Sequence, residues 1–321
     1  MNIIHIGLGK TATSTWQKFI FPLIAENRNL KFNDSRFTSL LRKFILTDLN
    51  SKQKTYFQKI LGEEGNIISN ENLIGWNPRL WEANADKNKE LFGSNNIILI
   101  SLPISTSEYL NSIYIHKIQS SVIVEPNDLY LNKYEYDKYK KSNGDLERVF
   151  DVDSFDLNFL INLYSERFEN VVTYNPMSVN QIGPLFKLSS EEIETIKNII
   201  KTKKSNKSFS KLAIWLTIMK EKILNKINLC SNKRNLNLVK LIREEELLLP
   251  KRSHNFKNVT KIKKIFLYPI KSLKTLFSWN FFIRNIFDRL IPYKKYRITE
   301  DFYRNLELEK SNDRVIAKHR T

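Results

Sequence analysis

A run of small, basic and hydroxyl-bearing residues lies close to the N-terminus. It contains Gly7, Gly9, Lys10, Thr11, Ala12, Thr13, Ser14 and Thr15. Glycine lets the backbone approach a ligand closely, lysine supplies a positive charge, and hydroxyls and amide N–H groups donate hydrogen bonds to phosphate oxygens. These residue types at this spacing favour a loop that cradles a phosphate. A helix start whose hydroxyls only cap the backbone is the plainer alternative.

The run does not match the phosphate loop of magnesium-dependent nucleotide hydrolases. That pattern requires a glycine five residues before the Gly9–Lys10 pair, and this chain has Ile4 there. Magnesium-dependent nucleotide hydrolysis therefore loses support. A nucleotide kinase of related fold is a less favoured alternative for the same reason.

A strand and a helix must hold this loop. Residues 2–6 are a short apolar run, and a helix-like pattern begins at Thr15. The first N–H groups of a helix lack partners within the helix and point at one spot, where the helix dipole adds positive potential. The order strand, loop, helix thus places the loop where an anion binds.

Further apolar segments predict the rest of the fold. We expect strands at 66–69, 95–101 and 170–174, and helices at 31–61, 109–118 and 155–168. Another helix is expected to start at Ser189, with Glu192 as its capping-box partner. Strands that alternate with helices indicate an α/β protein of three layers, in which a mostly parallel sheet carries helices on both faces.

The formal net charge of +18 is concentrated in the last third of the chain. Residues 1–200 carry 22 basic and 24 acidic side chains, whereas residues 201–321 carry 30 and 10. We therefore expect an α/β core over 1–200, and over 201–321 a basic, aromatic-rich helical region that completes the domain or forms a surface-binding appendage. Lys and Arg interleaved with Phe and Trp suit an anionic membrane surface, so a membrane-surface protein is a second hypothesis. Nucleic acid is not an expected partner, because no nucleic-acid motif is present.

Cysteine usage and hydropathy bear on the compartment. Cys230 is the single cysteine, which excludes an internal disulfide framework and a thiolate metal cluster. The first residues lack the pattern of a signal peptide, and no apolar run approaches the ~20 residues of a membrane-spanning helix. The sequence predicts a cytoplasmic protein and leaves open a peripheral position at the inner membrane surface.

The segment from His5 to Gln17 resembles the 5′-phosphosulfate-binding loop of sulfotransferases that use 3′-phosphoadenosine 5′-phosphosulfate (PAPS). In bacterial members that loop commonly reads Pro-Lys-Thr-Gly-Thr-Thr-Ser-Leu-Gln, and here Gly9 replaces the Pro and Ala12 the Gly. The resemblance runs from Met1 to about Met177 and returns at intervals. It implies the P-loop-like sulfotransferase fold, PAPS as co-substrate without a metal, and Lys10 and the loop as the phosphosulfate site. The methyl group of Ala12 would crowd a backbone conformation that glycine makes easy.

Residues 68–73 resemble the Ser-Ser-Glu-Leu segment that follows the second strand in bacterial members of this family. The resemblance implies that Glu71 is the base that takes the proton from the acceptor hydroxyl. Its plainer interpretation is an exposed glutamate at a helix start. His5 and His116 are rival bases, since histidine is the commonest general base near neutral pH.

Residues 107–114 resemble the helix of the family's 3′-phosphate site. Ser112 corresponds to the serine that binds the 3′-phosphate, but Ile104 stands where the family has an arginine, and the chain has no Arg between Arg79 and Arg148. Ser105 lies nearby. Lys204 and Lys207, in a segment similar to the family's basic Asn-x-Ser loop, are candidates for the missing charge. Residues 311–314 resemble the family's closing helix, although Asp313 departs from it.

The resemblance implies transfer of a sulfuryl group to a hydroxyl of a carbohydrate or glycolipid acceptor. The loop that selects the acceptor is expected at 119–150, because such loops vary in form and carry specificity. A catalytically degenerate family member is the alternative that the missing arginine keeps open.

Overall fold

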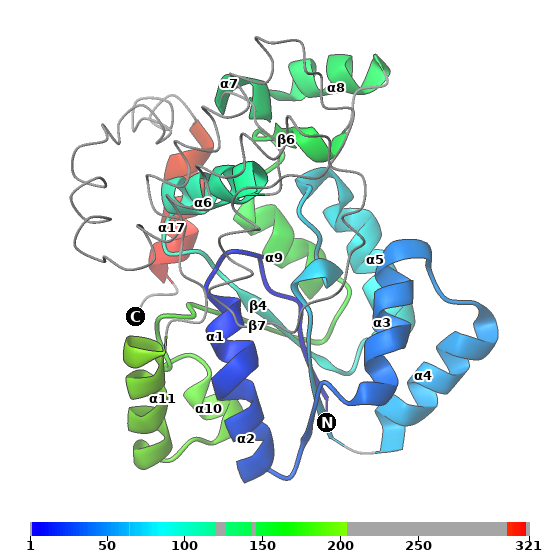
Figure 1. Cartoon of the computed structure of the whole chain (residues 1–321), viewed down its shortest axis with the longest axis vertical. Coiled ribbons are helices and arrows are strands. Elements are labelled where there is room, and N and C mark those ends of the chain that lie inside the picture. Colours follow the sequence, from blue (N-terminus) through cyan, green and yellow to red (C-terminus); the bar gives the residue numbers. More distant parts are fainter. Residues whose placement is uncertain (1, 64, 120–125, 143–145, 204–306, 319–321) are drawn as a thin grey trace, which may run out of the picture. The chain divides into compact units, whose positions relative to one another are not determined.

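A computed structural model describes residues 2–63, 65–119, 126–142, 146–203 and 307–318 (Figure 1). The chain divides into two compact units. The first comprises Met1–Ile113, Asn127–Lys207 and Glu300–Thr321, and the second comprises Tyr114–Pro126 and Ser208–Thr299. The features described below belong to the first unit unless stated otherwise.

A sheet of five parallel strands forms the centre of the first unit. Its strands, in spatial order, are β2 (Lys31–Phe32), β3 (Asn66–Ser69), β1 (Ile3–His5), β4 (Ile97–Ser101) and β7 (Asn170–Tyr174). In register, His5 of β1 lies opposite Ser69 of β3 and Leu99 of β4. The prediction of an α/β protein with a mostly parallel sheet is confirmed.

Helices connect these strands. Between β1 and β4 they are α1 (Thr13–Thr15), η1 (Trp16–Ile20, a π-helical turn), α2 (Phe21–Asn27), α3 (Ser35–Thr47), α4 (Ser51–Glu63), η2 (Glu71–Leu73), η3 (Pro78–Leu80) and α5 (Trp81–Phe92). Later helices are α6 (Thr106–Gln119), α9 (Leu157–Ser165), α10 (Gly183–Phe186), α11 (Ser190–Thr202) and α17 (Glu307–Lys318). A smaller part comprises α7 (Pro126–Leu129), β5 (Tyr130–Leu131), α8 (Lys133–Lys141), η4 (Leu146–Arg148) and β6 (Phe150–Asp151), in which β5 pairs with β6.

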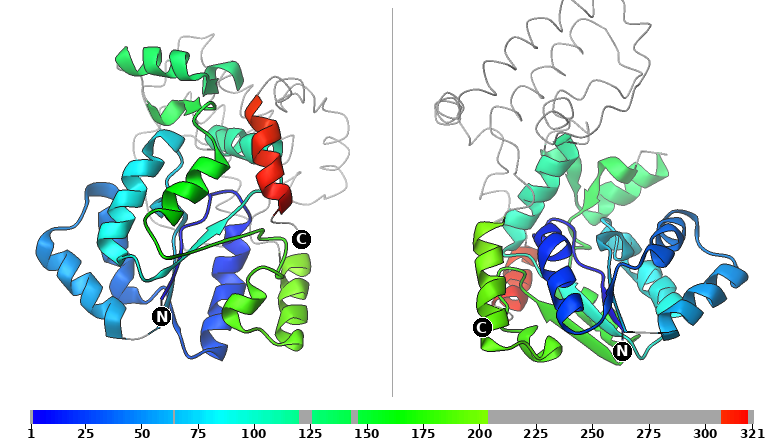
Figure 2. Two further views of the ribbon diagram at one scale, coloured as in Figure 1. Left: turned by 180° about the vertical axis from the view of Figure 1, so that it is seen from behind. Right: turned by 60° about the horizontal axis from the view of Figure 1, so that its bottom comes forward.

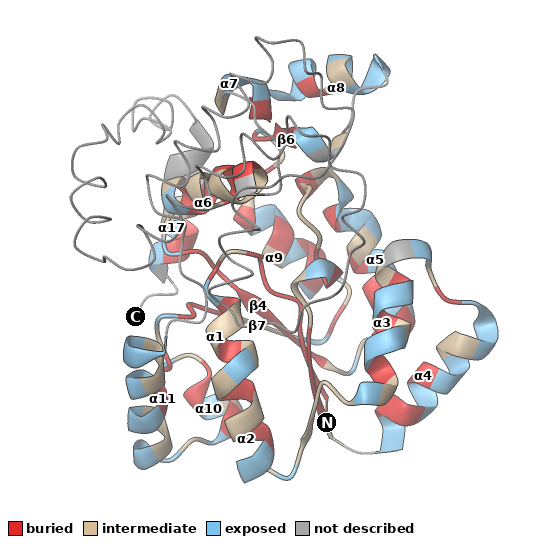
Figure 3. Cartoon of the chain, viewed as in Figure 1, coloured by how far each residue is buried: buried red, intermediate tan, exposed pale blue. Residues whose placement is uncertain are grey.

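The sheet carries helices on both faces. One buried cluster joins alternate strand residues to η1, α2, α10 and α11; it includes Ile3, Ile67, Leu99, Tyr174, Trp16, Phe21, Phe186 and Ile196. The chain crosses from β1 to β2 in one direction and then returns across the sheet from β2 through β3 and β4 to β7. Because such crossovers are right-handed, the return connections place α3, α4, α5 and α9 on the opposite face. Figure 2 shows both layers, and Figure 3 shows β4 buried between them.

The structure agrees with the predicted start of α11 and differs from the prediction over 31–61. The capping box of Ser189 and Glu192 is confirmed, with both reciprocal hydrogen bonds formed at the start of α11. The single helix expected over 31–61 is wrong, because β2 takes its first residues and a break at Asp48, where φ is 79°, separates α3 from α4. A two-residue edge strand is too short to produce a periodicity in the sequence.

The helix α17, near the end of the chain, packs against α9 within the first unit. Asn312 of α17 is fully buried, and its side chain accepts a hydrogen bond from Leu157 N (2.8 Å) and donates one to Phe155 O (2.8 Å). Thus α17 fixes the turn that begins α9. Most of the basic region expected over 201–321 lies outside the described residues, which include only 201–203 and 307–318 of it. None of the helices in the described ranges combines the length and apolar character that crossing a bilayer requires.

Candidate functional site

The loop between β1 and α1 has a backbone that turns repeatedly through left-handed conformations. Gly7, Lys10 and Ala12 have φ values of 52°, 69° and 64°. A side chain at Gly7 would have little space, since a Cβ atom there would lie 3.2 Å from Cε1 of His5 and 3.3 Å from Oγ of Ser101. Gly7 is therefore required both by its φ and by close packing.

This conformation turns several amide groups away from acceptors within the protein. The N–H groups of Gly9, Thr11 and Ala12 have no hydrogen-bond acceptor among the residues that the structure describes. Left-handed residues within such a turn direct successive N–H groups toward a concave site, and the continuous helix from Thr13 to Asn27 adds its N-terminal potential. N–H groups without acceptors at a helix start are an arrangement that can bind an anion.

Ser101, at the end of β4, supports the loop from below. Its Oγ accepts a hydrogen bond from Leu8 N (3.1 Å) and shares one with Oγ1 of Thr11 (2.8 Å). Thr11 Oγ1 also donates to Leu8 O (2.6 Å). The hydroxyl of Thr11 therefore braces the loop from inside.

Glu71 reaches the loop from the neighbouring strand. It opens η2 directly after β3, where Asn70 caps the turn by accepting a hydrogen bond from Asn72 N (3.0 Å). Thr13 Oγ1 donates a hydrogen bond to Glu71 Oε2 at 2.9 Å. Because β1 and β3 are adjacent parallel strands, their carboxyl ends bring these two segments together. The predicted base and the predicted phosphate loop are therefore in direct contact.

The other loop hydroxyls differ in their surroundings. Thr15 Oγ1 donates to Lys203 O at 3.2 Å, and Ser14 is half-buried in the same helical turn. The structure thus gives Thr11, Thr13 and Thr15 protein partners, because each hydroxyl has one hydrogen to donate and finds a near acceptor. Anion binding would rest chiefly on the amides and on Lys10.

Lys10 and Trp76 lie together at the loop. The ammonium of Lys10 lies 5.7 Å from the centroid of the Trp76 ring, within the range of a cation–π interaction. Trp76 also packs on Gly9, since a Cβ atom at Gly9 would lie 2.8 Å from Cζ2 and Cη2 of the indole. Sequence reasoning missed Trp76, because an isolated tryptophan after a glycine carries no motif.

His5 is buried beneath the loop and is not placed to serve as a base. Its Nδ1 lies 2.6 Å from Oγ of Ser69 and its Nε2 lies 3.1 Å from the Tyr174 hydroxyl, while Gln17 Nε2 donates to Ser69 Oγ at 3.1 Å. Burial lowers the pKa of His5 to about 3. His5 therefore stays neutral at physiological pH and ties β1 to β3, β7 and the first helix.

The predicted 3′-phosphate residues lie on and before α6. Ser105 caps this helix, because its Oγ accepts a hydrogen bond from Glu108 N at 3.2 Å. Ser112 is half-buried about two turns further along. Ile104, at the family's arginine position, is 42% exposed. From α17, Asp313 Oδ1 accepts hydrogen bonds from Thr106 N (3.0 Å) and Thr106 Oγ1 (3.1 Å).

A carboxylate thus lies at the start of α6, beside the residues predicted to bind the 3′-phosphate. Lys204 and Lys207 lie outside the described residues. The adjacent Lys203 lies beside the loop helix, with its carbonyl bonded to Thr15 and its ammonium 5.5 Å from the centroid of the Phe19 ring. The sequence alone does not distinguish Lys203 from Lys204 and Lys207 as the lysine beside the loop helix.

His116 lies in the last turns of α6, within the second compact unit. Its role as a base stays a prediction from the sequence. The described ranges hold no group of three or more His, Cys, Asp or Glu side chains placed to ligate a metal ion.

Replacing Ala12 by glycine will raise the free energy of unfolding by about 1 kcal/mol. Ala12 has φ 64° and ψ 15° at the start of α1, a left-handed conformation that disfavours any residue with a Cβ atom. Urea denaturation of Ala12→Gly measures the gain. The matched control is Ala85→Gly in the interior of α5, which should lower the free energy by at least about 1 kcal/mol. A loss of stability in Ala12→Gly would contradict the left-handed assignment.

No protein-family model, curated protein or solved structure matches the chain.

Proposed function

We propose that the protein is a PAPS-dependent sulfotransferase of the P-loop-like fold, which moves a sulfuryl group to a hydroxyl of a carbohydrate or glycolipid. The observation that carries the proposal is the 2.9 Å hydrogen bond between Thr13 and Glu71. It brings a carboxylate to the first turn of the helix behind an anion-binding loop. A base beside such a loop suits transfer of an anionic group to a hydroxyl.

In the proposed reaction, the acceptor oxygen attacks sulfur in line with the bond to the leaving phosphate. Glu71 takes the acceptor's proton as the new S–O bond forms. The old bond between sulfur and the bridging oxygen breaks, and its electron pair leaves with adenosine 3′,5′-bisphosphate. Lys10 and the amides of Gly9, Thr11 and Ala12 stabilise the charge that grows on the leaving phosphate, because fixed donors act most strongly where charge develops.

Two further observations support the proposal. The strand order β2-β3-β1-β4-β7 places the loop strand at the centre of the sheet, with β3 and β4 on either side of it. Glu71 follows β3, and Ser101 ends β4 beneath the loop. The site is thus assembled from the carboxyl ends of three adjacent parallel strands, which is where α/β sheets bind ligands.

The 3′-phosphate end of the cofactor is the weaker part of the match. Asp313 at the start of α6 repels a second phosphate, and the described residues offer no arginine in place of Ile104. We therefore expect the 3′-phosphate to add less affinity here than an arginine would give. If the 3′-phosphate adds no affinity at all, the protein is a catalytically degenerate member of the family.

Adenosine 3′,5′-bisphosphate will raise the melting temperature of the protein more than ATP or AMP does. A ligand that binds only the folded state stabilises it by about 2.7 kcal/mol at a concentration of 100 Kd. Lys10→Ala will remove most of this shift, whereas Lys18→Ala, an exposed lysine of the same helix, will keep it. Equal melting-temperature shifts with bisphosphate and AMP would mean that the protein does not recognise the 3′-phosphate. No shift with any of the three nucleotides would refute the proposed function.

A further inference from the structure

Trp76 occupies a particular position relative to the loop cation. Two carbons of its indole, Cζ2 and Cη2, lie 2.8 Å from the place that a Gly9 side chain would take, so the ring rests on the loop backbone. The same ring lies 5.7 Å from the Lys10 ammonium. One half-buried side chain thus touches both the residue that carries the charge and the residue before it.

The segment that carries Trp76 is held on both sides. On one side, Asn84 Nδ2 donates to Ile74 O at 2.9 Å, and Gly75 turns the chain with φ 79°. On the other side, Asn77 caps η3 and its amide donates to the Tyr136 hydroxyl at 2.7 Å. These anchors fix the backbone on either side of the indole.

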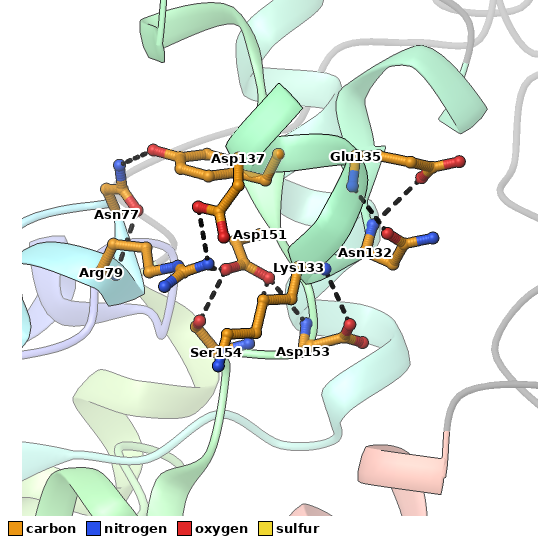
Figure 4. Close-up of polar contacts among 10 residues, drawn as sticks. Asn77, Arg79, Asn132, Lys133, Glu135, Asp137, Asp151, Asp153 and Ser154 are labelled. Carbon is orange, nitrogen blue, oxygen red and sulfur yellow. Dashed lines mark hydrogen bonds and ion pairs between the residues drawn. The ribbon is translucent and has the colours of Figure 1, made fainter. Parts of the chain in front are cut away.

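An ion pair with a buried carboxylate strengthens the second anchor, as Figure 4 shows. Asp151 has no exposed surface, and it accepts hydrogen bonds from Arg79 Nε, from Ser154 Oγ (2.6 Å) and from Asp153 N (3.1 Å). Arg79 also donates to Asp137 at 3.2 Å. The chain three residues beyond Trp76 is therefore pinned to β6 and α8.

We propose that Trp76 is a positioning residue for Lys10, which its indole holds beside the loop before an anion arrives. A free lysine side chain loses about 2 kcal/mol of rotamer entropy when it is fixed, and a ring that already restricts it lowers that cost at the moment of binding. The left-handed backbone of Lys10, at φ 69°, fixes where its side chain leaves the loop. The inference rests on the anion-binding half of the proposed function and not on sulfuryl transfer.

A double-mutant cycle on inorganic pyrophosphate binding tests the inference. Calorimetric titration should give an affinity about two- to five-fold weaker for Trp76→Leu than for the unchanged protein, with part of the loss restored in Trp76→Phe. In a Lys10→Met background, Trp76→Leu should change the affinity by less than about 1.5-fold, because no cation is left to position. Circular dichroism and urea denaturation verify that each variant is folded.

The outcomes separate this inference from the proposed function. Equal losses from Trp76→Leu with and without Lys10 would overturn the positioning role, because a purely structural role does not depend on the lysine. Absence of pyrophosphate binding in the unchanged protein would overturn it too. Coupling between the two residues with no preference for adenosine 3′,5′-bisphosphate over pyrophosphate would support the inference and count against the sulfotransferase.

Discussion

Glu71→Gln will lower the rate of sulfuryl transfer about 10²- to 10⁴-fold while binding of adenosine 3′,5′-bisphosphate stays nearly unchanged. Glutamine keeps the shape of the side chain, and its carbonyl can still accept the hydrogen bond from Thr13. It cannot take a proton from the acceptor. Release of bisphosphate from PAPS, followed with a panel of methyl glycosides as acceptors, measures the rate.

The control for this variant is Glu82→Gln. Glu82 is also a carboxylate in the first turn of a helix, but it lies exposed on α5. Its replacement should leave the transfer rate within about two-fold, as is usual for a surface substitution away from the site. A Glu71→Gln protein that transferred at the rate of Glu82→Gln would exclude Glu71 as the base and leave His116 as the candidate.

The central fold and the contact of Glu71 with the loop could be predicted because they depend on local patterns and one topological rule. The strand at 97–101 is an apolar run that ends in a serine, and the strand at 66–69 has two isoleucines at its centre. Both are buried throughout, as is typical of a parallel sheet covered on both faces. Once β1 and β3 are neighbours, the residues that follow them share one edge. Thr13 and Glu71 then meet although they are 58 residues apart in the chain.

The contacts that the sequence did not predict join ordinary residues across long separations. Asp313 bonds to Thr106 from 207 residues away, and Asp313 is the residue of 311–314 that departs from the pattern of its neighbours. Trp76 contacts Lys10 because Gly75, Asn77 and Asn84 set the course of its segment. Such contacts depend on the packed fold, because the direction of a side chain is set by the element that carries it and by its neighbours in space, and the local sequence does not reveal these neighbours.

The hydroxyls of the loop illustrate the same limit at short range. A row of Ser and Thr at a helix start predicts donors, but it does not say whether ligand or protein accepts from them. The hydroxyl of Thr11 lies 2.8 Å from Oγ of Ser101, and the hydroxyl of Thr13 donates its hydrogen bond to Glu71. The bonds to Ser101 fix the loop, and a fixed loop holds its amides in place for an anion.

Arg79→Met will lower the free energy of unfolding by about 3 kcal/mol. Asp151 is fully buried, and removal of Arg79 leaves its charge without a cation among its described partners. Breaking a buried pair in this way typically costs about 3–5 kcal/mol. We expect the lower end of that range, because Ser154 and Asp153 still donate hydrogen bonds to the carboxylate. Urea denaturation gives the free energy.

Arg36→Met is the matched control, because Arg36 also bonds two carboxylates, Asp34 and Glu63, and both of these reach solvent whereas Asp151 does not. Its loss should be about 0–1 kcal/mol, since exposed ion pairs contribute little. The double variant Arg79→Met, Asp151→Asn should recover part of the stability that Arg79→Met loses, because no unpaired charge then remains buried. Equal losses in Arg79→Met and Arg36→Met would mean that the Asp151 carboxylate is solvated, and the anchor beyond Trp76 would then be too weak to fix the indole over the loop.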